Sequence, residues 1–350
     1  MYIFEYILWY IIAFLIFILI QFLFRKIIKK LWLRIIIILF ELFLGIGLAY
    51  LIMTGPNWYI QKFSSAFYIV LFCDPFAKII LLFKKEYKFK TYSLLSFFVC
   101  TIFLIYGIIN MQIVSPKYLT FESNKLKNDY KIAFIADMHI GSSQSINISK
   151  KTINKIKNEK PDFIFLGGDI IDSYTKKEEM YEVLNEFKDF NNPIYYIYGN
   201  HDVELTFGDY ELKKCLNDNN IIITKDEYVK LASDLTLLGR EDDSISDRIN
   251  IEKLKNPYDD TYLIALDHQP FKFLDNCKAK IDLQLSGHTH AGQLFPLRMI
   301  YDTRVYAYGT YYNGDAILNV SSGASGWLFP LRTEVGCQFE IINLKSVNNS

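Results

Sequence analysis

The chain has 350 residues, with 38 basic and 38 acidic side chains in uneven positions. Residues 1–114 hold eleven basic and four acidic side chains, which leaves 27 basic and 34 acidic side chains for residues 115–350. An acidic C-terminal part is a poor electrostatic match for a polyanion, so we expect no nucleic-acid partner. Its three widely spaced cysteines indicate neither a disulfide framework nor a paired-cysteine metal site.

Residues 1–114 have the composition of a membrane module. Four apolar stretches approach the roughly 20 residues that a spanning helix needs; they are 3–24, 31–53, 63–83 and 91–114. The third contains Asp74 and Lys78, so a re-entrant or interfacial segment is the alternative to a span there. Glu41 and Asp74 either mark a functional polar site or face neighbouring helices, and we favour the second interpretation.

Basic residues between the stretches predict their orientation. Four lie in residues 25–30, after the first stretch, and four lie in residues 84–90, before the last. The positive-inside rule places both loops in the cytoplasm and both chain ends outside. The first stretch lacks the basic flank and cleavage site of a removable signal peptide. We therefore expect a multi-pass protein of the cell membrane whose C-terminal domain is extracytoplasmic, with the lipid bilayer as its partner.

Residues 115–350 read as one further domain, which begins at Ser115-Pro116. Buried strands are predicted where β-branched and aromatic residues cluster, at 131–136, 162–166, 194–198, 262–266 and 281–285. Amphipathic segments predict helices at 149–160, 176–190 and 207–217. Turn-rich strands are predicted at 305–312, 316–320 and 337–343. The alternation favours a layered α/β domain.

All five histidines of the chain lie in short polar motifs of this domain. The motifs are Asp137-Met-His139, Gly168-Asp169-Ile-Ile-Asp172, Gly199-Asn200-His201-Asp202, Asp267-His268 and Gly287-His288-Thr-His290. Each follows a predicted strand, and the carboxyl ends of strands in an open sheet place ligands along one edge. A capped turn or a core histidine would explain any single motif. Together their imidazole, carboxylate and amide groups predict a site for two divalent metals, the arrangement that serves phosphoryl transfer.

The motif series resembles the calcineurin-like metallophosphoesterase superfamily. The form Gly287-His-Thr-His-Ala-Gly-Gln293 most resembles its bacterial membrane-associated branch, with Ala291 where glycine is usual. The resemblance covers about residues 117–345 and implies a four-layer α/β/β/α sandwich with a dinuclear metal centre on one edge. It implies one metal on Asp137, His139 and His290, a second on Asn200, His268 and His288, and Asp169 as the bridge between them. Mn²⁺ is the favoured ion, and Zn²⁺, Fe²⁺ and Mg²⁺ are the alternatives.

The catalytic role of His201 follows from the same resemblance, whereas candidate substrate contacts follow from residue chemistry. His201 is expected to face the substrate as a catalytic residue, with Asp202 orienting its ring, while Asp172 supports the site rather than binding a metal. Arg240 and Arg332 are candidate substrate contacts because a guanidinium suits phosphate, although surface arginines would give the same pattern. Three aromatic residues near the site form either an apolar wall or ordinary loop packing; they are Phe295, Trp327 and Phe329.

The predicted function is a membrane-anchored dinuclear phosphoesterase. It would hydrolyse phosphodiester or pyrophosphate bonds, of lipid or envelope substrates, by a metal-bridging hydroxide. A diester is favoured because two metals can cover both non-bridging oxygens, whereas a monoester dianion calls for further cations. The alternatives are a phosphomonoesterase and a non-catalytic membrane sensor or scaffold. No particular protein partner is indicated.

Overall fold

The computed structural model describes residues 2–23, 30–54, 58–81, 88–203, 205–258, 260–302 and 306–347. Most of the two basic loops, and the first residue of the strand predicted at 305–312, lie outside these ranges. The chain divides into two compact units. The helical unit comprises residues 1–110, 294–297 and 328–333, and the sandwich unit comprises residues 111–293, 298–327 and 334–350.

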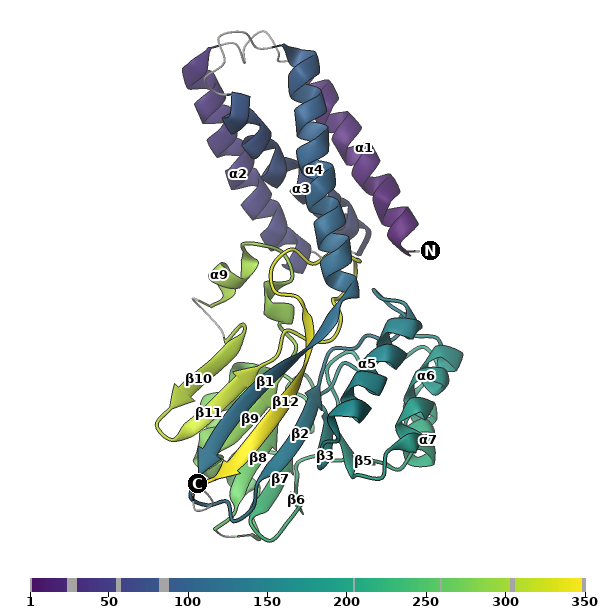
Figure 1. The fold of residues 1–350 in the computed structure, drawn as a ribbon, viewed down its shortest axis with the longest axis vertical. Helices are drawn as coiled ribbons and strands as arrows, with labels where there is room; N and C mark the ends of the chain where they lie inside the picture. Colours follow the sequence, from purple (N-terminus) through teal and green to yellow (C-terminus); the bar gives the residue numbers. More distant parts are fainter. Residues whose placement is uncertain are drawn as a thin grey trace. The chain divides into compact units, whose positions relative to one another are not determined.

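Four long apolar helices build the helical unit (Figure 1). They are α1 (Tyr2–Leu23), α2 (Leu31–Thr54), α3 (Trp58–Leu81) and α4 (Phe89–Gln112). All four are long and apolar enough to cross a membrane. In α3 the apolar window is 72% buried, against 22–28% in the other three helices, so α3 is the central helix of the unit. This burial explains why α3 carries polar residues and still forms a helix through Pro75.

The polar residues of these spans contact one another. Lys78 of α3 forms ion pairs with Glu41 of α2 and, at 2.9 Å, with Asp74 on its own helix. Gln21 of α1 donates to Glu41 at 2.7 Å, and Tyr92 of α4 donates to Asp74 at 2.7 Å. Glu41 and Asp74 thus face neighbouring helices, and one buried network joins all four spans. Buried charges in an apolar unit need such partners.

Two six-stranded sheets form the centre of the sandwich unit. The first has the order β1 (Val114–Ser123), β12 (Cys337–Ser346), β2 (Tyr130–Ile135), β3 (Phe163–Leu166), β4 (Ile194–Tyr196) and β5 (Ile221–Ile223). The second has the order β10 (Gly309–Asn313), β11 (Ala316–Val320), β9 (Leu283–Ser286), β8 (Tyr262–Leu266), β7 (Leu235–Gly239) and β6 (Glu227–Lys230). Strands β2, β3, β4 and β5 are mutually parallel, as are β7, β8, β9 and β11.

Helices cover the outer face of each sheet. The first sheet carries α5 (Ile146–Glu159), α6 (Lys177–Leu184), η2 (Asn185–Asp189) and α7 (Asp209–Asp218). The second carries η3 (Ile251–Lys253), η4 (Pro270–Lys272), α8 (Phe273–Asn276) and η5 (Cys277–Ala279). The connection after β9 contains η6 (His290–Gly292) and α9 (Leu297–Tyr301).

Alternation along the strands divides the core into three apolar layers. Ala133 and Ile135 of β2 pack towards the helices α5 to α7, whereas Ile132 and Phe134 pack between the sheets with Leu237 of β7. Leu238 of β7 packs on the other side, in the cluster that contains Phe273 of α8. Successive strand residues point to opposite faces, so each central strand serves two layers. The four-layer α/β/β/α sandwich and the N-terminal all-helical module, both predicted from the sequence, are confirmed.

Four strands have no counterpart in the sequence analysis: β1, β5, β6 and β7. β1 occupies the segment after Gln112 that was expected only to end the last span, and it pairs in parallel with β12. Its Pro116 is tolerated because β1 is the edge strand of its sheet. The segment also alternates weakly between buried and exposed positions, so it lacks a clear strand pattern.

Candidate metal centre

The candidate ligands follow the carboxyl ends of five parallel strands. Asp137 and His139 follow β2, Asp169 follows β3, and Asn200 follows β4. From the second sheet, His268 follows β8, and His288 and His290 follow β9. Packing one sheet on the other brings these two sets of loops together along one edge, as the strand-end positions of the motifs predict.

The backbone of these loops is strained at the candidate ligands themselves. Five of them have a positive φ, from 42° to 71°: Asp137, His139, Asp169, His288 and His290. Non-glycine residues rarely adopt this region, and such conformations gather where a site requires them. Gly168, with φ of 88°, lies against Gly199 and the ring of His268, and a Cβ there would meet the Gly199 nitrogen at 2.7 Å. The glycines of the motifs therefore allow the loops to approach closely.

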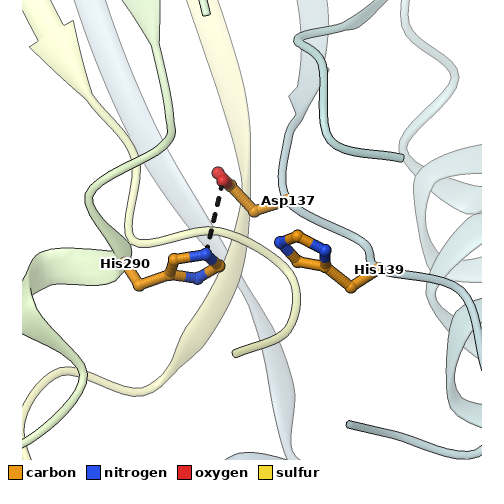
Figure 2. A group of neighbouring side chains, drawn as sticks. All are labelled: Asp137, His139 and His290. Atoms are coloured by element: carbon orange, nitrogen blue, oxygen red, sulfur yellow. Dashed lines mark ion pairs between the residues drawn. The ribbon is translucent and has the colours of Figure 1, made fainter. Parts of the chain in front are cut away.

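Asp137, His139 and His290 form the first cluster, with one ligand atom of each within 4.8 Å of the others. Figure 2 shows the three side chains converging, with the ion pair between Asp137 and His290 marked. All three are buried. The Nδ1 atom of His139 contacts Asp172, and that of His290 contacts the Ser325 carbonyl at 3.2 Å. Each ring is thereby oriented through Nδ1, as in histidines that bind metals through Nε2.

Asp169, His268 and His288 form the second cluster, again with ligand atoms within 4.8 Å. His268 Nδ1 is 2.9 Å from the carbonyl oxygen of Gly167, and His268 Nε2 is 3.0 Å from Asp169 Oδ2. His288 Nδ1 lies 2.9 Å from Asn200 Oδ1, which brings the predicted amide ligand to the same place.

The carboxylate of Asp169 reaches both clusters. Its Oδ2 atom lies 3.0 Å from His268 Nε2 and 3.9 Å from His139 Nε2. The Nε2 atom of His139 is buried and has no hydrogen-bond partner within the part of the chain that the structure describes, and Nε2 of His268 is buried beside the same Asp169 carboxylate. Buried polar atoms normally have a partner, and two imidazole nitrogens near one shared carboxylate fit a pair of metal ions. The donor set, imidazole with carboxylate and amide oxygen, suits divalent first-row metals.

Burial and neighbouring charges shift the pKa values of the candidate ligands. Although burial alone would lower it, the carboxylates of Asp169 and Asp137 raise the pKa of His268 well above its usual range. Burial raises the pKa of Asp137 to about 6. Burial and the neighbouring His268 lower the pKa of His288 to about 4, which keeps its ring neutral, the form that binds a metal. A potential that stabilises protonated imidazole also favours metal cations.

His201 lies beside the first cluster without belonging to either. Its ring stacks on Trp327, with centroids 5.2 Å apart and planes 23° apart, and lies 5.4 Å from the ring of His139. Trp327 is held in turn by Gln293, which accepts from the Trp327 amide at 2.9 Å. His201 is half-buried, so its ring can be reached by a substrate.

Asp202 binds the backbone of two metal-site loops. Its buried carboxylate accepts from the amides of Asp169 at 2.7 Å, Gly199 at 2.8 Å and Ile171 at 3.0 Å. Burial and the nearby Asp169 raise the pKa of Asp202 to about 7. These contacts join the loops after β3 and β4, and the role of Asp202 in orienting the His201 ring stays a prediction.

The two candidate substrate arginines are buried and lie in different units. Arg240 is 3% exposed and forms an ion pair with Asp226. Arg332 is fully buried in the helical unit, where its amide donates to the Gly107 carbonyl at 3.0 Å. Phe295 and Phe329 also belong to the helical unit and pack against Phe72 and Tyr6, respectively. Among the three aromatic residues considered, Trp327 is therefore the one that contacts a catalytic candidate.

The sequence analysis missed the residues that hold His268 in place. Besides the Gly167 carbonyl, Arg248 forms two hydrogen bonds with Asp267, at 2.9 and 2.6 Å, and Asn276 donates to Asp267 at 2.7 Å. Asp267 directly precedes His268, so these bonds fix the backbone of a candidate ligand. No local pattern marks Arg248, because its partner is brought close by the adjacency of β7 and β8.

Comparisons with known proteins define the class. The profile of the calcineurin-like phosphoesterase family matches residues 130–292. An uncharacterized metallophosphoesterase of Campylobacter jejuni is 31% identical in an alignment that covers 83% of each chain. One from Helicobacter pylori strain J99 is 32% identical over 62% of this chain and 59% of its own length. A transmembrane protein with metallophosphoesterase domain from Danio rerio is 24% identical over 72% of this chain and 62% of its own.

The chain belongs to the calcineurin-like metallophosphoesterase family, which confirms the resemblance drawn from the motifs. Membership places it among the phosphoric ester hydrolases, and its two Asp/His clusters agree with a family that binds divalent metals. Its four apolar helices are candidate membrane spans.

Proposed function

We propose that this protein is a membrane-anchored, two-metal phosphoesterase that hydrolyses phosphodiester or pyrophosphate bonds of lipid or envelope substrates. The observation that supports it most directly is the position of Asp169, whose Oδ2 lies between His139 Nε2 and His268 Nε2. Asp137, His139 and His290 would hold one ion, and Asn200, His268 and His288 the other, with Asp169 shared. Mn²⁺ is the favoured ion, and Zn²⁺, Fe²⁺ and Mg²⁺ are the alternatives.

Bound there, the two ions would supply Lewis-acid polarisation of the phosphoryl oxygens and a water molecule acidified to near neutral pH. The residues of the chain supply the remaining functions. His201, stacked on Trp327 and half-buried, is positioned to donate a proton to the leaving oxygen. Asp202 joins the loop that carries His201 to the loop that carries Asp169, because its carboxylate accepts three backbone hydrogen bonds.

A diester or pyrophosphate is favoured because, among the described residues, the arginines near the motifs have their charge already paired or buried and so add no free positive charge at the metal centre. Arg240 is paired with Asp226, Arg298 donates to Glu334 at 3.0 Å, and Arg332 is fully buried in the helical unit. A monoester dianion would call for such cations beyond the two metals. A diester has one negative charge, which the metals alone can neutralise.

A lipid or envelope substrate follows from the membrane anchor. Four candidate spans tether the domain to a bilayer, where lipid-linked phosphoesters are concentrated. The charges of the connecting loops support an extracytoplasmic position for the site. The proposed localisation is therefore the cell membrane, with the domain facing away from the cytoplasm.

Hydrolysis of matched aryl phosphate esters by the full-length protein in detergent micelles tests the proposal. With Mn²⁺ added, the diester should be cleaved with a higher kcat/KM than the monoester, and a lipid-linked diester in mixed micelles should be better still. A tenfold preference for the monoester would establish a phosphomonoesterase instead. Inactivity on every ester, with both metals bound, would favour a sensor or scaffold.

A further inference from the structure

A cavity lies in the sandwich unit, between the segments that follow β7 and β8. Its volume is about 330 Å³, within the range of small-molecule pockets. It is formed by the loop after β7, which includes Arg240 and Arg248, and by the segment after β8, which includes Lys272 and Lys278. Arg248 forms the bidentate pair with Asp267, the residue before His268. Arg248 thus connects the lining of the cavity to the loop of a candidate metal ligand.

Basic side chains outnumber acidic ones in the lining of this cavity. Four basic side chains line it, Arg240, Arg248, Lys272 and Lys278, against two acidic ones, Asp243 and Asp275. Residues 115–350 as a whole have the opposite balance, with 27 basic and 34 acidic side chains. Each of the four basic side chains has a carboxylate partner, and the pairs of Arg240 and Arg248 are buried. Attraction for an anion therefore depends on the two lysines, whose ion pairs are exposed.

The inner part of the cavity is rigid and contains an unused donor. Arg240 is 3% exposed, pairs with Asp226 and donates from Nη2 to the Ile249 carbonyl at 2.9 Å. Its Nε atom is buried and has no hydrogen-bond partner among the described residues, and neither has Oδ1 of Asn276. A guanidinium that is fixed by two hydrogen bonds and keeps an unpartnered Nε–H is a preorganised anion donor.

The outer part consists of two exposed lysines with exchangeable partners. The side chains of Lys272 and Lys278 are 45% and 53% exposed. Lys272 lies 3.9 Å from Asp243, and Lys278 lies 3.1 Å from Glu252 and 3.2 Å from Asp275. Exposed ion pairs of this kind contribute little free energy, so both ammonium groups can turn to a ligand without a large penalty.

We propose that this cavity binds the phosphate group of a small phosphorylated molecule. Lys272 and Lys278 would contact the phosphate oxygens, and Arg240 would supply the buried donor. The phosphate could come from the far end of a long substrate held at the metal centre, or from a separate regulatory molecule. Both sources share the same recognition chemistry, and kinetics with two substrates separates them.

Binding of inorganic pyrophosphate to the chelator-treated, full-length protein in detergent is the first test. Calorimetry should detect binding by the wild type and by Lys253→Gln, a control on an exposed lysine in neighbouring η3. The double variant Lys272→Gln/Lys278→Gln should bind at least tenfold more weakly. No binding by the wild type, or equal binding by the double variant and the control, would overturn the proposal. Because this assay needs no hydrolysis, its failure is separate from failure of the proposed function.

Steady-state kinetics of the metal-loaded protein then identify the source of the phosphate. If the ligand is part of the substrate, the double variant should raise the KM for a nucleotide sugar and leave that for a small aryl phosphodiester unchanged. If it is a regulator, added AMP should change the rate on the aryl diester in the wild type and in Lys253→Gln, but not in the double variant. A double variant that matches Lys253→Gln in both measurements would contradict the proposal.

Discussion

The Nδ1 atom of His139 lies 3.0 Å from Oδ2 of Asp172, and both side chains are buried. Asp172 is itself fixed, since its Oδ1 accepts from the Tyr174 amide at 2.8 Å. Burial opposes ionisation, but His139 outweighs it and holds the pKa of Asp172 below its usual value. The ionised carboxylate therefore orients the ring of His139 so that Nε2 faces Asp169. Such carboxylate–histidine contacts tune metal ligands in other proteins.

Replacing this carboxylate should weaken the first metal site. We expect Asp172→Asn to reduce metal affinity by about 10–100-fold, because the neutral amide no longer favours the tautomer with the proton on Nδ1. Metal titration of chelator-treated protein measures the change. Asp189→Asn, on an exposed surface residue, is the control. Unchanged affinity in Asp172→Asn would show that His139 does not depend on Asp172.

Asp169 and His201 should differ in their effect on metal content. Asp169→Asn should abolish occupancy by two metals, because the shared carboxylate is lost. His201→Ala should retain both metals and lose about 10²–10⁴-fold in turnover, the usual contribution of an acid–base group. Elemental analysis combined with kcat measurement tests both variants. Equal loss of metal from the two would identify His201 as a ligand.

Asp234 should make part of the stability depend on pH. Burial alone would raise its pKa, but hydrogen bonds from Tyr130 and from the amides of Lys127 and Asn128 hold the pKa below its usual value. A depressed pKa stabilises the fold fully above the unfolded-state value, about 3.9, and the effect disappears as pH falls through the folded-state value.

Asp234→Asn should therefore lower the midpoint of thermal unfolding at pH 7. The expected loss in the free energy of unfolding is about 1–3 kcal/mol. The difference from the wild type should shrink as the pH falls below about 4. Asp218→Asn, at an exposed helical position, should change the midpoint little at either pH. A deficit in Asp234→Asn that stays constant from pH 7 down to pH 3 would contradict this account.

The charge network of the helical unit predicts strong coupling between Glu41 and Lys78. Lys78→Met alone should destabilise the protein by about 3–5 kcal/mol, because two buried carboxylates lose their cation. Glu41→Gln/Lys78→Met should recover part of that loss, since one of the two charges is removed as well. Thermal unfolding in detergent measures the coupling free energy between the two substitutions. Lys90→Met, at an exposed lysine, is the control. Additive effects would mean that the ion pair is energetically unimportant.

The basic loops predict the orientation of the spans. A reporter fused after Ser350 should behave as extracytoplasmic, and a cysteine placed within residues 84–90 should be shielded from reagents added outside. Labelling of intact cells, before and after permeabilisation, distinguishes the two sides. A cytoplasmic C-terminus would mean that α3 does not cross the membrane.

The sequence by itself determined the class of protein and the positions of the candidate ligands. Asp137, Asp169, Asn200, His268 and His288 each stand in a motif that follows an apolar run. Such signals are local, because strand propensity, glycine turns and ligand type are all visible within about ten residues. The four apolar stretches were visible for the same reason, since length and hydropathy define a span.

Only the tertiary structure decided which groups meet. The approach of Asp169 to both His139 and His268 depends on the register of β3 against β2 and on the packing of one sheet over the other. The same packing pairs Arg240 with Asp226 and Arg248 with Asp267, and it leaves a cavity between the segments that follow β7 and β8. The ion pair between Lys78 of α3 and Glu41 of α2 depends on tertiary packing in the same way. These contacts join residues far apart in the chain, so the free energy that selects them comes from packing and desolvation, which no local pattern encodes.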